Sequence, residues 1–63
     1  MTTAPPDPMF DVNDKVQLVL TGRTGWVLMH EWASWRGCYV YTVRFRDGAD
    51  LTVPENVLEA SNE

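Results

Sequence analysis

Three features common in other small proteins are missing from this chain of 63 residues. Cys38 is its one cysteine, so an intrachain disulfide and a zinc site built from cysteine pairs are both excluded. Uninterrupted apolar runs such as residues 26–29 are far shorter than the roughly 20 residues of a membrane-spanning helix. No lysine or arginine precedes Lys15, which leaves no basic region for a signal peptide. These absences predict a cytoplasmic protein with no membrane partner.

Positive charge is also scarce. The chain has five Lys and Arg residues against nine Asp and Glu residues, a net charge of −4. Nucleic-acid affinity comes mainly from cations that neutralise phosphates, so this balance disfavours a general attraction to DNA or RNA. Four of the five cations are arginines, and a local basic face therefore stays an alternative; they are Arg23, Arg36, Arg44 and Arg46.

Residue patterns that support catalysis are equally few. His30 is the only histidine, and nothing in the spacing places a nucleophile beside it. Residues 22–25 contain two glycines but precede a predicted strand, whereas phosphate loops lead into the N-terminus of a helix. We therefore predict no enzyme activity, no cofactor and no metal site.

The order of the chain predicts one domain. Residues 1–8 contain three prolines and no periodic apolar pattern, which predicts a disordered N-terminal tail. Residues 9–60 form the predicted domain, and residues 61–63 should fray. Hydrophobic residues make up 44% of the chain and charged residues 22%, as is usual for a folded protein.

Apolar and polar residues alternate in a way that predicts antiparallel strands over residues 15–21, 26–31, 38–46 and 49–53, with a short fifth strand through residue 59. Asp47-Gly48 predicts a hairpin turn with a positive φ at the glycine. Pro54 presets the φ of a tight turn over residues 54–58. Together these signals predict an all-β protein in which five short strands form a small antiparallel barrel.

One predicted strand, residues 26–31, has a blurred pattern. Trp26, Leu28 and His30 face one way and Val27 and Met29 the other, so either both faces are covered or the strand bends at a bulge. On the next strand, Tyr39, Tyr41, Val43 and Phe45 share one face. Other positions predicted to face inward are Val16, Leu18, Leu20, Trp26, Leu51 and Val53.

Aromatic residues are the feature with functional content. Five of the seven lie within residues 32–45, more than a core of this size needs. Trp32 and Trp35 fall in a segment, residues 31–37, that is predicted to be a loop unable to bury both rings. They either form a contact surface or fold back as a lid over an open end of the barrel. The predicted surface, for a protein partner or for self-association, comprises Trp32, Trp35, Arg36, Tyr39 and Tyr41.

Four segments resemble SH3-like barrels of the Tudor and KOW type: residues 13–16 (Asn-Asp-Lys-Val), 24–27 (Thr-Gly-Trp-Val), 41–48 (Tyr-Thr-Val-Arg-Phe-Arg-Asp-Gly) and 53–58 (Val-Pro-Glu-Asn-Val-Leu). The resemblance spans residues 13–60. It implies a five-stranded SH3-like antiparallel barrel with a short 3-10 turn before the last strand. Such barrels dock partners, bind peptides or bind nucleic acid. The nucleic-acid alternative would use Arg23, Arg36, Arg44 and Arg46.

The frame is also similar to that of the plasmid-encoded type II dihydrofolate reductases, which work as tetramers around a central pore. Their pore is lined by a Val-Gln-Ile-Tyr run, where this chain has residues 50–53 (Asp-Leu-Thr-Val). It also has residues 17–19 (Gln-Leu-Val) where the family has pore lysines. Because the residues that bind cofactor and folate are missing, the resemblance implies a related frame without the reductase activity. An oligomeric reductase relative stays a second alternative to the interaction module.

Overall fold

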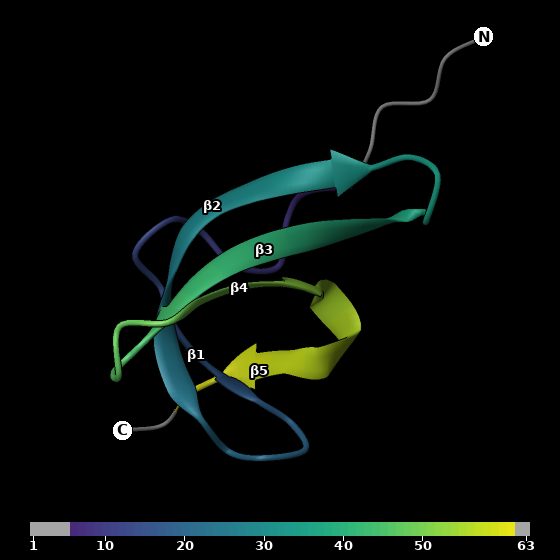
Figure 1. Ribbon diagram of the computed structural model, residues 1–63. Helices are drawn as coiled ribbons and strands as arrows, with labels where there is room; N and C mark the ends of the chain where they lie inside the picture. The colour runs from purple at the N-terminus through teal and green to yellow at the C-terminus, as the bar shows by residue number, and fades with distance from the viewer. Residues whose placement is uncertain (1–5, 62–63) are drawn as a thin grey trace, which may run out of the picture.

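The computed structural model describes residues 6–61 and consists of β-strands joined by short turns (Figure 1). The only helical segment among these residues is a single 3-10 turn, so the predicted all-β class is confirmed. In chain order the elements are β1 (Lys15–Leu18), β2 (Thr24–Ala33), β3 (Cys38–Phe45), β4 (Asp50–Pro54), the 3-10 turn η1 (Glu55–Val57) and β5 (Leu58–Ala60).

The five strands form one antiparallel sheet in the order β4-β3-β2-β1-β5. The η1 turn carries the chain from β4, at one edge, to β5, at the other edge, where β5 pairs with β1. Figure 1 shows the sheet curling around its core. Within residues 6–61 the edge strands β4 and β5 are not paired with each other, so the sheet is open rather than a closed barrel. The same residues include no helix long and apolar enough to cross a membrane.

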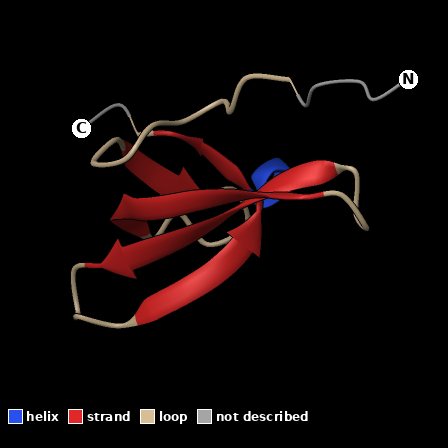
Figure 2. Ribbon diagram, turned by 90° about the horizontal axis from the view of Figure 1, so that it is seen from above, coloured by secondary structure: helices blue, strands red, loops and turns tan. Residues whose placement is uncertain are grey.

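The β2 strand is longer than the sequence predicted. It continues to Ala33, and Trp32 pairs with Tyr39 of β3 instead of lying in a loop. The register shifts between Val27 and Met29, which confirms the bulge that the blurred alternation allowed. As a result β2 and β3 form a long hairpin whose tip reaches beyond η1 (Figure 2).

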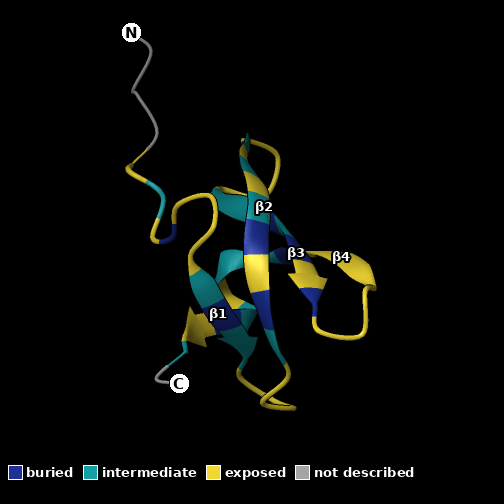
Figure 3. Ribbon diagram, turned by 90° about the vertical axis from the view of Figure 1, so that its left-hand side faces the viewer, coloured by how far each residue is buried: buried dark blue, intermediate teal, exposed yellow. Residues whose placement is uncertain are grey.

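The buried residues that form the core are distributed along the strands (Figure 3). The buried members of the core are Phe10, Val16, Val27, Tyr41, Val43, Phe45, Val53 and Leu58, with Leu18, Tyr39 and Val57 packed against them. Three predicted core positions are wrong: Leu20 is 92% exposed, Leu51 46% and Trp26 39%. Leu20 lies past the end of β1, because that strand stops at Leu18 instead of residue 21. Trp26 pairs with Arg44 and lies on the opposite face of the sheet.

Two hairpin loops have the same construction. Residues 19–23 join β1 to β2, with the N–H of Leu18 donating to the carbonyl of Arg23, and residues 34–37 join β2 to β3. In each loop the fourth residue is a glycine, Gly22 or Gly37, whose N–H donates to the carbonyl before the loop and whose φ is +72° or +71°. Glycine suits this left-handed conformation, which costs other residues free energy. The predicted positive φ at Gly48 is also confirmed, at 91°.

The ends of the chain are only partly described. Residues 6–8 have no regular secondary structure, and the rest of the predicted tail, residues 1–5, lies outside the described residues. Residues 62–63 of the predicted frayed end also lie outside them. Phe10 is a core residue that the sequence pattern did not predict. It is 6% exposed, and its ring packs edge-to-face against that of Tyr41.

Candidate interaction surfaces

Four of the five predicted contact residues gather at the tip of the β2–β3 hairpin. Trp32 and Tyr39 face each other across the last pairs of the hairpin, with ring centroids 5.1 Å apart in an edge-to-face arrangement. Trp35 lies in the four-residue loop and is 80% exposed, and the guanidinium of Arg36 lies 5.6 Å from its ring. We call Trp32, Trp35, Arg36 and Tyr39 the hairpin-tip surface.

The two tryptophans of this surface differ in burial. Trp32 is half-buried because it packs against Tyr39, itself half-buried against the core. Trp35 has no such support from the sheet, since the loop projects it outward. A lid over the core would bury both rings, whereas here the ring of Trp35 is mostly exposed to solvent. This arrangement agrees with the contact-surface interpretation for Trp35 and leaves Trp32 with a partly structural role.

Tyr41, the fifth predicted contact residue, is a core residue with 0% exposure. Its hydroxyl donates to a carboxylate oxygen of Glu55 at 2.5 Å and accepts the N–H groups of Met9 at 3.0 Å and Phe10 at 3.4 Å. These bonds fasten the N-terminal segment and η1 to β3. Burial of the ring, and then the hydrogen bond to Glu55, raise the pKa of Tyr41 from 10.0 to about 12. The prediction placed Tyr41 on the surface because it shares a strand face with Tyr39.

The ring contacts of the hairpin-tip surface continue along the hairpin into the core. His30 lies edge-to-face with Tyr39 at 5.8 Å and with Tyr41 at 6.2 Å. His30 is half-buried among these rings, and Cys38 is half-buried at the start of β3. In the described part of the chain no group of three or more His, Cys, Asp or Glu side chains is placed to hold a metal ion.

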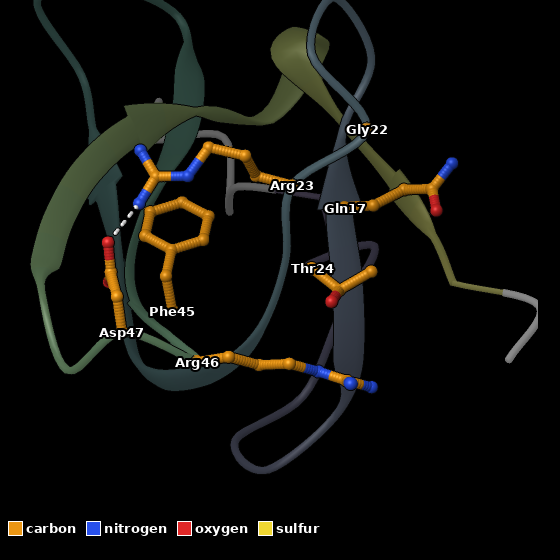
Figure 4. A pocket seen from close by; sticks show the side chains of 7 residues that line it. All are labelled: Gln17, Gly22, Arg23, Thr24, Phe45, Arg46 and Asp47. Atoms are coloured by element: carbon orange, nitrogen blue, oxygen red, sulfur yellow. Dashed lines mark hydrogen bonds and ion pairs between the residues drawn. The ribbon is translucent and has the colours of Figure 1, made fainter.

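An open pocket of about 510 Å³ lies at the other end of the hairpin (Figure 4). Arg23 lies over the ring of Phe45, 4.4 Å from its centroid, and pairs with the carboxylate of Asp47 at 2.9 Å. Figure 4 shows Arg46 extending the opposite way, toward the side of the pocket formed by Thr24 and Gln17. The four arginines of the alternative basic face are therefore not contiguous, because Arg36 lies at the hairpin tip and the others near this end.

One residue of potential functional interest, Trp26, was predicted as core. It is partly exposed, and the cationic groups of Lys15 and Arg46 lie 5.8 and 5.9 Å from its ring. The sequence pattern grouped Trp26 with Leu28 and His30 on one face. The register shift between Val27 and Met29 instead places Trp26 and His30 on opposite faces of the sheet.

Comparison with protein-family models finds no family that matches the chain, and comparison with curated proteins finds no match either.

Proposed function

We propose that this chain is a non-catalytic interaction module whose hairpin-tip surface binds a protein partner or a second copy of the chain. The observation that carries the proposal is the 80% exposure of Trp35 at the end of a hairpin that projects from the sheet. A large aromatic ring held away from the core contributes little to folding and is well placed to bury its surface against another molecule.

The surroundings of Trp35 favour a protein ligand. Arg36 and Tyr39 lie with the two tryptophans, and Trp, Tyr and Arg are the residue types that most often supply the binding energy of protein interfaces. Trp32 is held by Tyr39, so part of the surface is ordered before binding and loses little side-chain entropy. Trp35 then supplies most of the binding energy, and the ordered ring of Trp32 supplies contact area beside it.

We also propose that the curled sheet has the fold of the SH3-like domains of the Tudor and KOW type, although its edge strands β4 and β5 do not pair to close a barrel. A 3-10 turn before the last strand and five antiparallel strands support this assignment, since the resemblance in the sequence implies both. The fold by itself specifies no ligand, because many unrelated functions share it. The hairpin tip carries the functional proposal.

The test uses two variants that change equivalent positions of the two matched loops. Trp35 and Leu20 are each the second residue of a hairpin loop whose fourth residue is a left-handed glycine, and both are largely exposed. Trp35→Ala should therefore change the free energy of unfolding by no more than about 0.5 kcal/mol, as should the control Leu20→Ala. Urea unfolding followed by circular dichroism measures both.

Light scattering over a concentration series first determines whether the wild-type chain associates. If it does, Trp35→Ala should weaken association by about 30-fold or more, because a central aromatic anchor contributes about 2 kcal/mol, and Leu20→Ala should not. If it is monomeric, the immobilised chain should retain a protein that Trp35→Ala loses and Leu20→Ala keeps. Association or capture that is equal in all three chains contradicts the proposal.

A further inference from the structure

The open pocket at the end of the hairpin has a side chain with a second face available for stacking. The guanidinium of Arg23 lies over the ring of Phe45 and donates to the carboxylate of Asp47 at 2.9 Å (Figure 4). Phe45 is buried, but the Arg23 side chain is 46% exposed. A guanidinium is planar, so Phe45 covers one of its faces and the exposure of the side chain leaves the other accessible. We call Arg23, Phe45 and Asp47 the pocket wall.

The carboxylate of Asp47 has capacity for a further donor. Its Oδ1 accepts the N–H of Ala49 at 3.0 Å, and its Oδ2 accepts the bond from Arg23. A carboxylate offers about four lone-pair sites, and these two bonds use about half of them. The Asp47 side chain is also 62% exposed, so an incoming group can reach it. A ligand that suits the pocket wall therefore combines a flat ring for Arg23 with a cationic donor for Asp47.

The hairpin tip presents these two groups side by side. Trp35 is 80% exposed, and the guanidinium of Arg36 lies 5.6 Å from its ring. In the pocket wall the guanidinium of Arg23 and the carboxylate of Asp47 are in direct contact. An indole that stacks on Arg23 thus brings its neighbouring guanidinium close to Asp47. The tip and the pocket wall are complementary in shape and in charge.

The tip of one chain cannot reach the pocket of the same chain. The β2 strand runs from Thr24, which lines the pocket, to Ala33, where the tip loop begins. Nine steps along a strand correspond to roughly 30 Å. The contact therefore forms only between two chains. Because it joins different surfaces of the two copies, every chain that is added still offers one tip and one pocket.

We propose that the hairpin tip of one copy binds the open pocket of a second copy, so that the chains associate head to tail. This inference rests on the proposed function, because it uses the hairpin-tip surface and names the site that receives it. The pocket of about 510 Å³ is within the usual size range of ligand sites and is large enough for an indole. Two tips that met each other would instead bring the like charges of two Arg36 side chains together.

The expected association is weak. One aromatic side chain buries about 150–250 Å², whereas stable protein interfaces bury about 1,200 Å² or more in total. The contact between Arg36 and Asp47 joins exposed groups and adds little free energy, so salt should weaken the association only slightly. NMR spectroscopy at high protein concentration detects complexes of this strength.

The experiment mixes two variants that each lack one half of the contact. Trp35→Ala loses the ring of the tip and keeps the pocket, and Arg23→Gln loses the guanidinium of the pocket and keeps the tip. The wild type should diffuse more slowly as its concentration rises, and each variant alone should diffuse as a monomer. Mixed in equal amounts, the two variants should form a dimer that grows no further, because only one tip and one pocket are intact.

Isotope labelling of one variant at a time locates the contact. When labelled Trp35→Ala receives unlabelled Arg23→Gln, the amide signals of Thr24 and Asp47 at the pocket should shift. With the labels exchanged, the indole N–H signal of Trp35 should shift. The control Arg44→Gln removes an arginine from a comparable exposed ion pair, that with Asp50 at 2.8 Å, and should associate like the wild type.

A second pocket variant, Arg23→Lys, keeps the charge but not the planar face, and should associate as poorly as Arg23→Gln. Urea unfolding shows that both are folded, and either is sufficient for the test. Wild-type association in the Arg23 variants, or a mixture that stays monomeric, would overturn the inference and leave the proposed function standing, since the tip would then bind another site. A wild type that is monomeric at every concentration would also overturn it, and the capture test with Trp35→Ala then decides the proposed function alone. Association unchanged by Trp35→Ala would contradict both.

Discussion

Trp35 and Trp26 lie at opposite ends of the same hairpin, and each has cationic side chains beside its ring. Trp35 belongs to a four-residue loop and is 80% exposed, whereas Trp26 belongs to a strand and is 39% exposed. The loop projects the indole of Trp35 away from the sheet, and β2 holds that of Trp26 on the sheet between Lys15 of β1 and Arg44 of β3. The same pair of residue types therefore forms a protruding anchor at one end and a platform on the sheet at the other.

The bulge between Val27 and Met29 is what separates these two surfaces. Before it, Trp26 pairs with Arg44 on the convex face; after it, Trp32 pairs with Tyr39 on the side that continues into the core. Without the extra residue, strict alternation would place Trp26 and Trp32 on the same face. One inserted residue thus gives a small sheet two aromatic surfaces that face different ways.

The largest expected effect is on the free energy of unfolding, and it compares a core residue with a residue of the hairpin-tip surface. Tyr41 and Tyr39 share a strand face, yet Tyr41 is fully buried and Tyr39 only half-buried. Tyr41→Ala should cost about 3–5 kcal/mol, which is close to the whole stability of a domain this small. Tyr39→Ala should cost clearly less. Urea unfolding measures both, and equal losses would mean that the tip is part of the core and not a separate surface.

The second effect is a pH dependence that belongs to the core and not to either surface. The pKa of Tyr41 is about 12 in the folded chain against 10.0 ordinarily, so the unfolded state loses this proton first as the pH rises. The stabilisation is complete below pH 10 and declines between pH 10 and 12, by at most about 2.7 kcal/mol.

Urea midpoints across that range measure the decline, with Tyr41→Phe as the control that cannot ionise. The wild type should lose stability more steeply than Tyr41→Phe. Parallel curves for the two chains would show that the hydroxyl is accessible in solution and that the N-terminal segment does not hold it.

Much of the sheet could be predicted from the sequence because its signals are local. Alternation identifies the strands, and the Asp47-Gly48 pair identifies a turn, confirmed by its positive φ. Phe10 was missed because it contacts Tyr41, 31 residues away in the chain. Alternation within one strand does not indicate contacts between segments so far apart. Leu51 was wrongly placed in the core because the pattern gives its face but not that β4 is an edge strand.

The candidate site was predicted less completely, for a related reason. An alternating pattern assigns a residue to a face, but it does not say how far along the strand the core extends. Tyr41 was therefore grouped with Tyr39, although the first is buried and the second lies at the base of the tip. The platform at Trp26 was missed because the bulge reverses the alternation just after it.

The third effect is steric and compares one substitution at the two ends of the hairpin. A Cβ at Gly25, next to Trp26, would lie 2.6 Å from the carbonyl oxygen of Arg44 and 2.8 Å from Cγ1 of Val43. Gly25→Ala should thus cost about 1–3 kcal/mol. Gly37→Ala meets no atom within 4 Å, and its cost, about 1 kcal/mol, comes from its φ of +71°.

Urea unfolding of both variants measures the two costs. Gly25→Ala should lose more stability than Gly37→Ala, because only the first brings a Cβ into contact with the neighbouring strand. A loss in Gly37→Ala that equals or exceeds that in Gly25→Ala would mean that the close approach at Gly25 relaxes without cost, and the steric comparison between the two ends of the hairpin would fail.

The smallest effect is an expected near-absence of binding to duplex DNA, which tests the alternative of a general basic face on the hairpin. Arg36 lies at the hairpin tip and Arg23 and Arg46 line the pocket at the other end, so the arginines form no continuous basic surface. The net charge of −4 opposes DNA at longer range. At physiological salt a random duplex should therefore bind more weakly than the roughly 10⁻⁴ to 10⁻⁶ M of ordinary non-specific DNA-binding proteins. Fluorescence anisotropy of a labelled duplex measures the affinity. Micromolar binding that weakens steeply with salt would mean that the arginines at both ends act together, and the hairpin would present one electrostatic surface instead of two separate ends.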